Sequence, residues 1–190
     1  MPDLTEIERK RELPDEQALL GLLTELGYVA DAPVTEEDTY FSRPDVDYMT
    51  TVECLRVRRR GGIAEVTYKP ASTGTTHSAD DVVAKTETNV ALAGADQAAA
   101  AERLLANIGM RELVRVVKTR TTYRHPDLPG VTVNIDTVRD AGMFVETEVL
   151  QGTATTGAMG LIEAVEKELG IYGNSTVSLP YRDLVMQSRS

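Results

Sequence analysis

The sequence contains no tryptophan, two phenylalanines, one cysteine and two histidines among its 190 residues. A single cysteine cannot form an internal disulfide, and one cysteine with two histidines excludes a zinc site of the usual ligand spacings. Because large aromatic residues are scarce, we expect a core built from valine, leucine, alanine and isoleucine. Cys54 is a poor candidate for a nucleophile, since its apolar strand context predicts burial.

Long hydrophobic runs are also missing. None approaches the roughly 18 residues of a membrane-spanning helix, and the charged start of the chain does not resemble a secretory signal. The 30 acidic residues outnumber the 20 lysines and arginines, which gives a formal net charge of −10. Such a chain is not expected to bind nucleic acid or an acidic membrane surface. We therefore expect a soluble, cytoplasmic protein that folds as a single domain over residues 1–190.

Alternation of apolar and polar residues predicts β-strands over much of the chain. The strands are expected at residues 4–13, 39–41, 52–60, 63–69, 82–92, 112–123, 131–138 and 143–150. Residues 34–38 are expected to be an acidic loop and residues 45–50 a turn, and residues 61–62 are a hairpin signal between two of the strands. The pattern predicts about eight strands, mostly joined by hairpins.

Helices are inserted between these strands. Apolar residues at helical spacing predict them at residues 14–26, 94–108 and 160–169, with a short one near Leu184. Because strands and helices do not alternate regularly, a mainly β (α+β) fold with an antiparallel sheet or barrel is favoured. The helices are expected to pack on its outside.

Several predicted strands carry charged residues on one face and apolar residues on the other. The acids are Glu6, Glu8, Glu87, Asp136, Glu146 and Glu148, and the bases are Lys10, Arg56, Arg58, Lys69, Lys118 and Arg120. Isolated buried charges cost several kcal/mol each. The charged faces therefore form cross-strand pairs on an open, solvated sheet, or they face one another across a wet lumen with the apolar faces packed beneath the helices.

Charged faces that meet across a lumen could bind both a metal ion and a polyanion. Glu6, Glu8 and Lys10 share one face of a strand, with the two carboxylates roughly 7 Å apart. Carboxylates at this spacing suit a hard cation such as Mg²⁺ or Mn²⁺. Arginine binds phosphate through its planar fork, so the basic faces suit a polyanion. Alternation alone does not decide between the two interpretations.

Residues 6–10 resemble the E-x-E-x-K signature of the CYTH superfamily, the triphosphate tunnel metalloenzymes. Further matches follow in family order: D-T-Y-F at 38–41, L-R-x-R at 55–58, T-x-K at 67–69, K-x-R at 118–120, D-x-V at 136–138 and G-x-F-x-E-x-E at 142–148. The chain departs from the pattern at Ala141, where leucine is usual, at Arg11-Glu12, where an apolar residue is usual, and at residues 179–181, which replace a common Ser-Tyr.

The resemblance implies an eight-stranded antiparallel barrel, whose charged tunnel binds a triphosphate with Mg²⁺ or Mn²⁺. The implied metal carboxylates are Glu6, Glu8, Glu146 and Glu148, while Asp136 holds metal or orients a basic side chain and Glu87 is a weaker candidate. The implied triphosphate-binding and catalytic residues are Lys10, Arg56, Arg58, Lys69, Lys118 and Arg120. A homodimer is the expectation for the cyclases of this superfamily.

The resemblance is strongest to class IV adenylate cyclase-like proteins, which convert ATP to cyclic AMP and pyrophosphate. One alternative is a hydrolase of thiamine triphosphate or inorganic tripolyphosphate, and another is a triphosphate- or nucleotide-binding protein without turnover. A cyclase needs a pocket for adenine. Tyr40, Phe41 and Tyr123 are candidates to stack on a base or to lie in the core, and residues 71–81 are a candidate lid or a linker.

Overall fold

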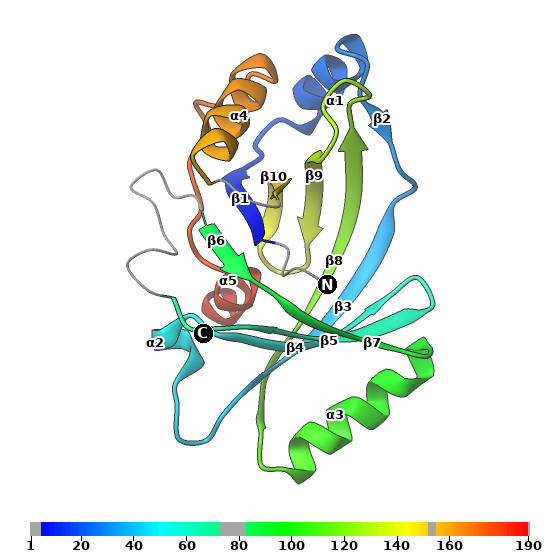
Figure 1. The fold of residues 1–190 in the computed structure, drawn as a ribbon, viewed down its shortest axis with the longest axis vertical. Helices are drawn as coiled ribbons and strands as arrows, with labels where there is room; N and C mark the ends of the chain where they lie inside the picture. Colours follow the sequence, from blue (N-terminus) through cyan, green and yellow to red (C-terminus); the bar gives the residue numbers. More distant parts are fainter. Residues whose placement is uncertain (1–4, 73–82, 152–154, 190) are drawn as a thin grey trace.

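The computed structural model describes residues 5–72, 83–151 and 155–189. These residues form one ten-stranded antiparallel sheet with helices packed on its outside (Figure 1). The strands are β1 Thr5–Glu12, β2 Val29–Ala30, β3 Val34–Ser42, β4 Cys54–Arg60, β5 Ile63–Lys69, β6 Val83–Thr86, β7 Thr88–Leu92, β8 Arg111–Arg124, β9 Val131–Val138 and β10 Gly142–Gln151. The helices are α1 Glu16–Glu25, α2 Tyr48–Thr51, η1 Ala95–Gln97, α3 Ala98–Asn107, α4 Thr155–Glu168 and α5 Tyr181–Ser188.

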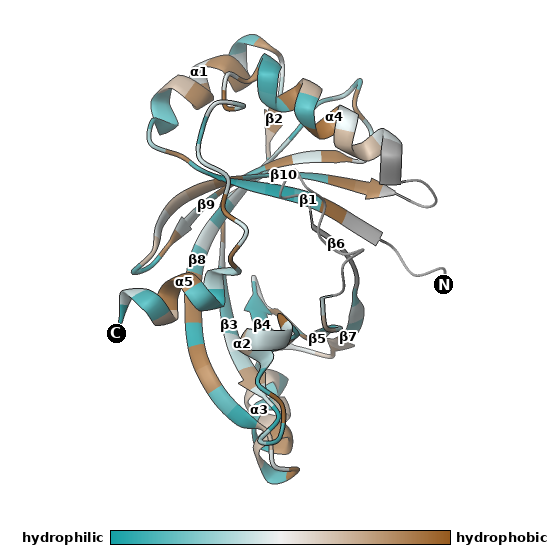
Figure 2. Ribbon diagram, turned by 90° about the vertical axis from the view of Figure 1, so that its left-hand side faces the viewer, coloured by the Kyte–Doolittle hydropathy of each residue, from teal (hydrophilic) through white to brown (hydrophobic). Residues whose placement is uncertain are grey.

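The sheet curves until its two edges approach each other. Its strand order is β6-β1-β10-β9-β8-β3-β4-β5-β7, with the short β2 paired to β8. The two edge strands are consecutive in the chain, because only Glu87 separates β6 from β7. β6 pairs with β1 and β7 pairs with β5, so one interrupted strand connects both edges (Figure 2). The expected tunnel-like fold with helices outside is confirmed, although its sheet is not a continuously hydrogen-bonded barrel.

The helices cover the apolar faces of the strands. α1 and α4 lie together over one part of the sheet (Figure 1) and share a core cluster with β1, β9 and β10. Its fully buried members include Ile7, Leu19, Leu23, Val133 and Ile162. α3 packs under the β4–β5 hairpin, where Phe41, Val57, Ala64 and Ala98 form a smaller cluster. The charged faces of the same strands are thereby left to face inward.

α5 covers the inward face where that face becomes apolar. Val114 and Val116 precede Lys118 on the same side of β8, and Phe144 precedes Glu146 on β10 in the same way. These apolar residues form a second cluster with Tyr40, Val138, Tyr181 and Val185. One end of the inward surface is therefore hydrophobic and closed by α5, while the rest is charged.

Three expectations about local structure are wrong. Residues 34–38 are not a loop but the first half of β3, in which Glu36 and Asp38 lie opposite Arg60 and Arg58 of β4. The expected turn at 45–50 overlaps the short helix α2, whose N-terminus is capped by Asp47 accepting a hydrogen bond from the Met49 amide at 2.9 Å. The count of eight strands is also too low, because β2 was not predicted and the strand expected at 82–92 is interrupted at Glu87.

Other local expectations are confirmed. The hairpin turn at Gly61 and Gly62 has positive φ at both residues, 52° and 89°, as a two-residue turn of this kind requires. The expected loop at residues 71–81 lies mostly outside the described residues. Among the residues that the structure describes, no helix is long and apolar enough to cross a membrane.

Candidate active site in a charged tunnel

The inward faces of the sheet enclose a cavity of about 320 Å³. It is lined by all six basic residues expected to bind triphosphate, namely Lys10, Arg56, Arg58, Lys69, Lys118 and Arg120. Four of the expected acids also line it: Glu8, Glu87, Glu146 and Glu148. Asp136 lies behind the cavity wall, and the side chain of Glu6 lies outside the described part of the chain. The structure therefore joins residues from distant parts of the sequence in one place.

Three of the acids form a compact cluster. Glu8 on β1 lies directly opposite Glu148 on β10, and Lys10 lies opposite Glu146. One carboxylate oxygen from each of Glu8, Glu146 and Glu148 lies within 4.8 Å of the other two. Burial raises the pKa of the Glu148 carboxyl, and the charges of Glu146 and Glu8 add to the rise while Arg120 opposes it. Hard oxygen ligands that repel one another in this way fit Mg²⁺ or Mn²⁺.

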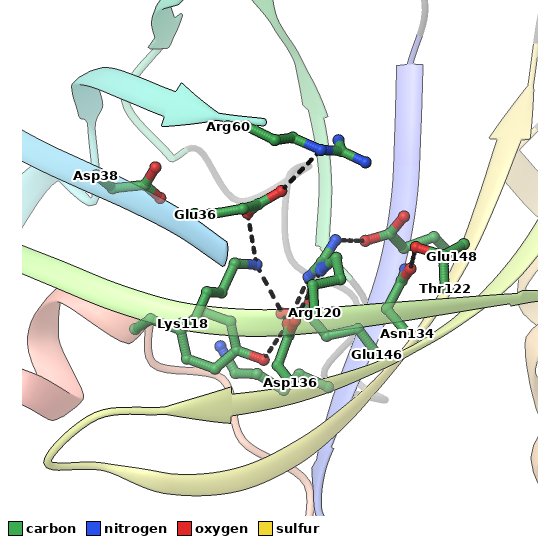
Figure 3. A network of polar contacts seen from close by, with 12 residues as sticks. Glu36, Asp38, Arg60, Lys118, Arg120, Thr122, Asn134, Asp136, Glu146 and Glu148 are labelled. Atoms are coloured by element: carbon green, nitrogen blue, oxygen red, sulfur yellow. Dashed lines mark hydrogen bonds and ion pairs between the residues drawn. The ribbon is translucent and has the colours of Figure 1, made fainter. Parts of the chain in front are cut away.

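Arg120 connects this cluster to the basic side of the tunnel (Figure 3). Its Nε donates to Asp136 Oδ1 at 2.8 Å and its Nη1 to Glu148 Oε1 at 3.0 Å, and Nη2 also contacts Glu146. Burial alone would raise the pKa of Glu146, but Arg120, Lys118 and Lys10 outweigh burial and leave that pKa well below its usual range. The Glu146 side chain is therefore ionised, as a carboxylate ligand of a metal must be.

Asp136 is fully buried and supports the basic side chains. It accepts hydrogen bonds from Lys118 Nζ at 3.2 Å, from Tyr181 Oη at 2.9 Å and from Arg120. It does not belong to the group of three clustered carboxylates that the described residues contain. Of the two roles expected for Asp136, this position favours the orientation of Lys118 and Arg120.

Tyr181, the first residue of α5, contacts two lysines of the site with its ring. Lys10 Nζ lies 4.3 Å from the centre of the Tyr181 ring and Lys118 Nζ lies 5.1 Å from it. Lys10 Nζ also donates to the Leu179 carbonyl at 2.6 Å. Burial lowers the pKa of Lys10, although the nearby Glu146 and Glu8 oppose this. The segment in which the sequence departs from the family pattern, residues 179–181, therefore forms part of the site.

Asp38 on β3 holds two arginines of β4 in place. Arg58 forms a two-pronged pair with Asp38, with Nε–Oδ1 and Nη2–Oδ2 distances of 2.7 Å each, and Arg56 Nη1 lies 3.6 Å from Asp38 Oδ2. On the other side of β4, Lys69 pairs with Glu87, at the interruption between β6 and β7. These supports fix the donors before any ligand arrives.

Sequence reasoning missed several residues of the site. Glu36, Arg60, Glu53 and Tyr181 line the cavity and were assigned no role there, and Asp38 was quoted as part of a motif without a function. Extending the alternation of β3 back from Tyr40 would have placed Glu36 and Asp38 on the tunnel face. Of the three candidates for base stacking, Tyr40 lines the cavity, whereas Phe41 and Tyr123 pack in the core clusters.

Comparison with known proteins identifies the family. The CYTH domain matches residues 4–181. A candidate adenylate cyclase of Methanocaldococcus jannaschii is 28% identical over 145 residues, which cover 76% of this chain and 77% of that protein. The solved structure of the PH1819 protein of Pyrococcus horikoshii superposes with a TM-score of 0.78 at 25% identity, covering 97% of this chain and 99% of the other. A candidate adenylyl cyclase of Hippeastrum, described as having a dominant triphosphatase activity, superposes with a TM-score of 0.68 at 17% identity, covering 96% and 95%. The chain belongs to the CYTH domain family.

Proposed function

We propose that the protein is a metal-dependent enzyme that breaks a phosphoanhydride bond of a triphosphate bound in the tunnel, with the conversion of ATP to cyclic AMP and pyrophosphate as its reaction. One observation carries the proposal. Three clustered carboxylates and six basic side chains line the same cavity. A metal–polyphosphate complex needs both kinds of group, because its cation binds oxygen ligands and its phosphate oxygens bind cationic donors.

The residues fit the expected metal. Glu8, Glu146 and Glu148 would hold Mg²⁺ or Mn²⁺, and Glu6 is proposed as a further ligand from the sequence pattern. When bound, such a cation neutralises phosphate charge and lowers the pKa of the attacking hydroxyl. The identity of the cation is part of the proposal.

The chain itself supplies positioned donors. Phosphoryl transfer requires little covalent help from the protein, so fixed positive groups around the phosphates provide most of the catalysis. Lys118 and Arg120 are held by Asp136, and Arg56 and Arg58 by Asp38. Donors fixed beforehand need not reorganise during the reaction, which favours a fast chemical step.

The wall of the cavity favours a nucleotide over an inorganic substrate. Tyr40 and Tyr181 belong to the second core cluster, Cys54 and Val177 pack against it, and all four also line the cavity. An inorganic polyphosphate has no apolar group to bury against this surface, whereas the base or sugar of a nucleotide can pack against it. In the proposed cyclase reaction the ribose 3′-oxygen gives up its proton to solvent water, forms a bond to the α-phosphorus, and displaces pyrophosphate as the bond between the α-phosphorus and the bridging oxygen breaks.

Hydrolysis of a triphosphate is the second candidate. The Hippeastrum protein, a candidate adenylyl cyclase, is described as having a dominant triphosphatase activity, so a protein of this fold can hydrolyse a triphosphate. In hydrolysis, water attacks the terminal phosphorus of tripolyphosphate or thiamine triphosphate, and orthophosphate is released. The same set of basic residues would hold either substrate.

The test is to incubate the protein with ATP, tripolyphosphate or thiamine triphosphate, each with Mg²⁺ or Mn²⁺, and to separate the products by chromatography. We expect cyclic AMP and pyrophosphate from ATP, and no product when EDTA is present. Orthophosphate without cyclic AMP would replace the cyclase with the hydrolase. Binding of all three ligands without any product would contradict both reactions and indicate a binding protein.

A further inference from the structure

Glu36 occupies the middle of the basic side of the tunnel. It lies on β3, directly opposite Arg60 on β4 and Lys118 on β8. Its carboxylate oxygens lie 3.1 Å from Arg58 Nη2, 3.5 Å from Arg60 Nε and 3.3 Å from Lys118 Nζ. Figure 3 shows the contacts with Arg60 and Lys118. The residue lines the cavity and is only 1% exposed. One carboxylate therefore forms ion pairs with three cations that line the cavity.

These contacts are ion pairs without hydrogen bonds. Among the described residues, neither oxygen of Glu36 has a hydrogen-bond partner. Burial alone would raise the pKa of Glu36, but Lys118 and Arg58 outweigh burial and leave that pKa lowered, so the group is charged. A buried carboxylate without a directed donor is held weakly compared with one that accepts hydrogen bonds.

Asp38, two residues further along the same face of β3, shows the opposite arrangement. Both of its oxygens accept hydrogen bonds from Arg58 at 2.7 Å, and it does not line the cavity. Asp38 thus supports Arg58 from behind, whereas Glu36 lies on the side from which a ligand would approach. A phosphate group offers more acceptor oxygens and more charge than a carboxylate, so it competes well for the donors that Glu36 now contacts.

We propose that Glu36 is an internal counter-anion of the tunnel. It positions Arg58, Arg60 and Lys118 while no ligand is present, and it competes with phosphate oxygens for the same three groups. Glu36 thereby weakens polyphosphate binding and speeds release of the anionic product. This inference rests on the proposed function, because it requires a polyphosphate to bind in the tunnel.

The test compares three variants that each replace an acid by its neutral amide. Titration calorimetry measures the Kd of tripolyphosphate and of pyrophosphate, with and without Mg²⁺. We expect Glu36→Gln to bind both anions about tenfold more tightly than the wild type, since a competing charge within 4 Å of three donors is lost. We expect Asp38→Asn to bind about tenfold more weakly, since Arg58 loses its support.

Glu65→Gln controls for the loss of one negative charge from the cavity wall. Glu65 lines the same cavity from β5. Among the described residues it forms no ion pair with the bases that Glu36 contacts, so its replacement should change the Kd by less than about threefold. Tightening equal to that of Glu36→Gln would overturn the inference, because a general charge effect would then explain it.

The thermal stability of Glu36→Gln gives an independent readout. Without ligand the variant should melt at a lower temperature than the wild type, because Arg58, Arg60 and Lys118 each lose one ion pair, although Arg58 keeps Asp38 and Lys118 keeps Asp136. With tripolyphosphate its melting temperature should rise by more than that of the wild type. A merely structural role would instead weaken binding together with stability, and that result would overturn the inference. Should Glu36→Gln fail to fold, Glu36→Asp withdraws the carboxylate by one methylene, and the same tightening is expected at smaller size.

Failure of this inference can be told apart from failure of the proposed function. A wild-type protein that binds no tripolyphosphate or pyrophosphate would overturn both. Wild-type binding without tightening in Glu36→Gln would overturn the counter-anion role alone.

Discussion

Replacing Glu8 by alanine should lower metal-dependent turnover by a factor of about a thousand or more. The factor follows because a catalytic cation contributes several kcal/mol of charge stabilisation in the transition state. Glu8 supplies one of the three clustered carboxylates, and it does so from a different strand than Glu146 and Glu148. Without it, the remaining two ligands are both paired with Arg120. Measurements of kcat with Mg²⁺ and with Mn²⁺ would show the loss.

The fold should survive this replacement. Glu8 is only half-buried, and its side chain makes no hydrogen bond with any residue that the structure describes. Glu12→Ala is the matched control, because Glu12 lies on the same strand but is exposed and does not line the cavity. Its turnover should stay near that of the wild type. Turnover of Glu8→Ala near the wild-type value would remove the metal assignment from this cluster.

The replacement Glu166→Ala should cause the largest loss of stability. Glu166 on α4 is fully buried and receives hydrogen bonds from Arg9 Nε at 3.0 Å and Arg11 Nε at 2.9 Å. Both arginines lie on the outer face of β1 and are only 5% exposed. Removing one partner of a buried ion pair costs about 3–5 kcal/mol. In a chain of this size that loss lowers the melting temperature by roughly 10 °C.

A neighbouring glutamate provides the comparison for Glu166. Glu163 lies on the same helix and pairs with Lys167 one turn later, but both side chains are exposed. Glu163→Ala should therefore cost only a few tenths of a kcal/mol. Urea unfolding of both variants would measure the difference. Equal stability of the two would mean that the Arg9–Glu166–Arg11 contact does not hold β1 against α4.

Some strands could be predicted from the sequence because turn residues mark both of their ends. The bounds expected for β5 and β9 agree with the structure, since clear alternation is delimited there by glycine turns. The first half of β3 was missed because its run of acids is typical of a loop. Those acids are stabilised in a strand by arginines of β4, about twenty residues away in the sequence.

The interruption at Glu87 had no local signal either, because alternation continues through it. The chain changes partners there only because β6 reaches β1 while β7 reaches β5. The same holds for the site. Period-two patterns and the family resemblance placed the six bases on inward faces, but the roles of Glu36, Asp136 and Tyr181 depend on contacts between distant segments. The roles of the individual site residues remain predictions until they are tested by mutation.

The pairing of β1 with β10 has a consequence for how the protein is made. Arg9 and Glu166, which join β1 to α4, are 157 residues apart in the sequence. A nascent chain therefore exposes β1 long before its neighbours have been synthesised, and folding dominated by such distant contacts is slow, on the order of milliseconds to seconds. The cluster of Glu8, Glu146 and Glu148 can assemble only when β10 docks on β1. A divalent cation that binds there should consequently bind the completed fold and not its precursors, and should pull the last step of folding toward completion.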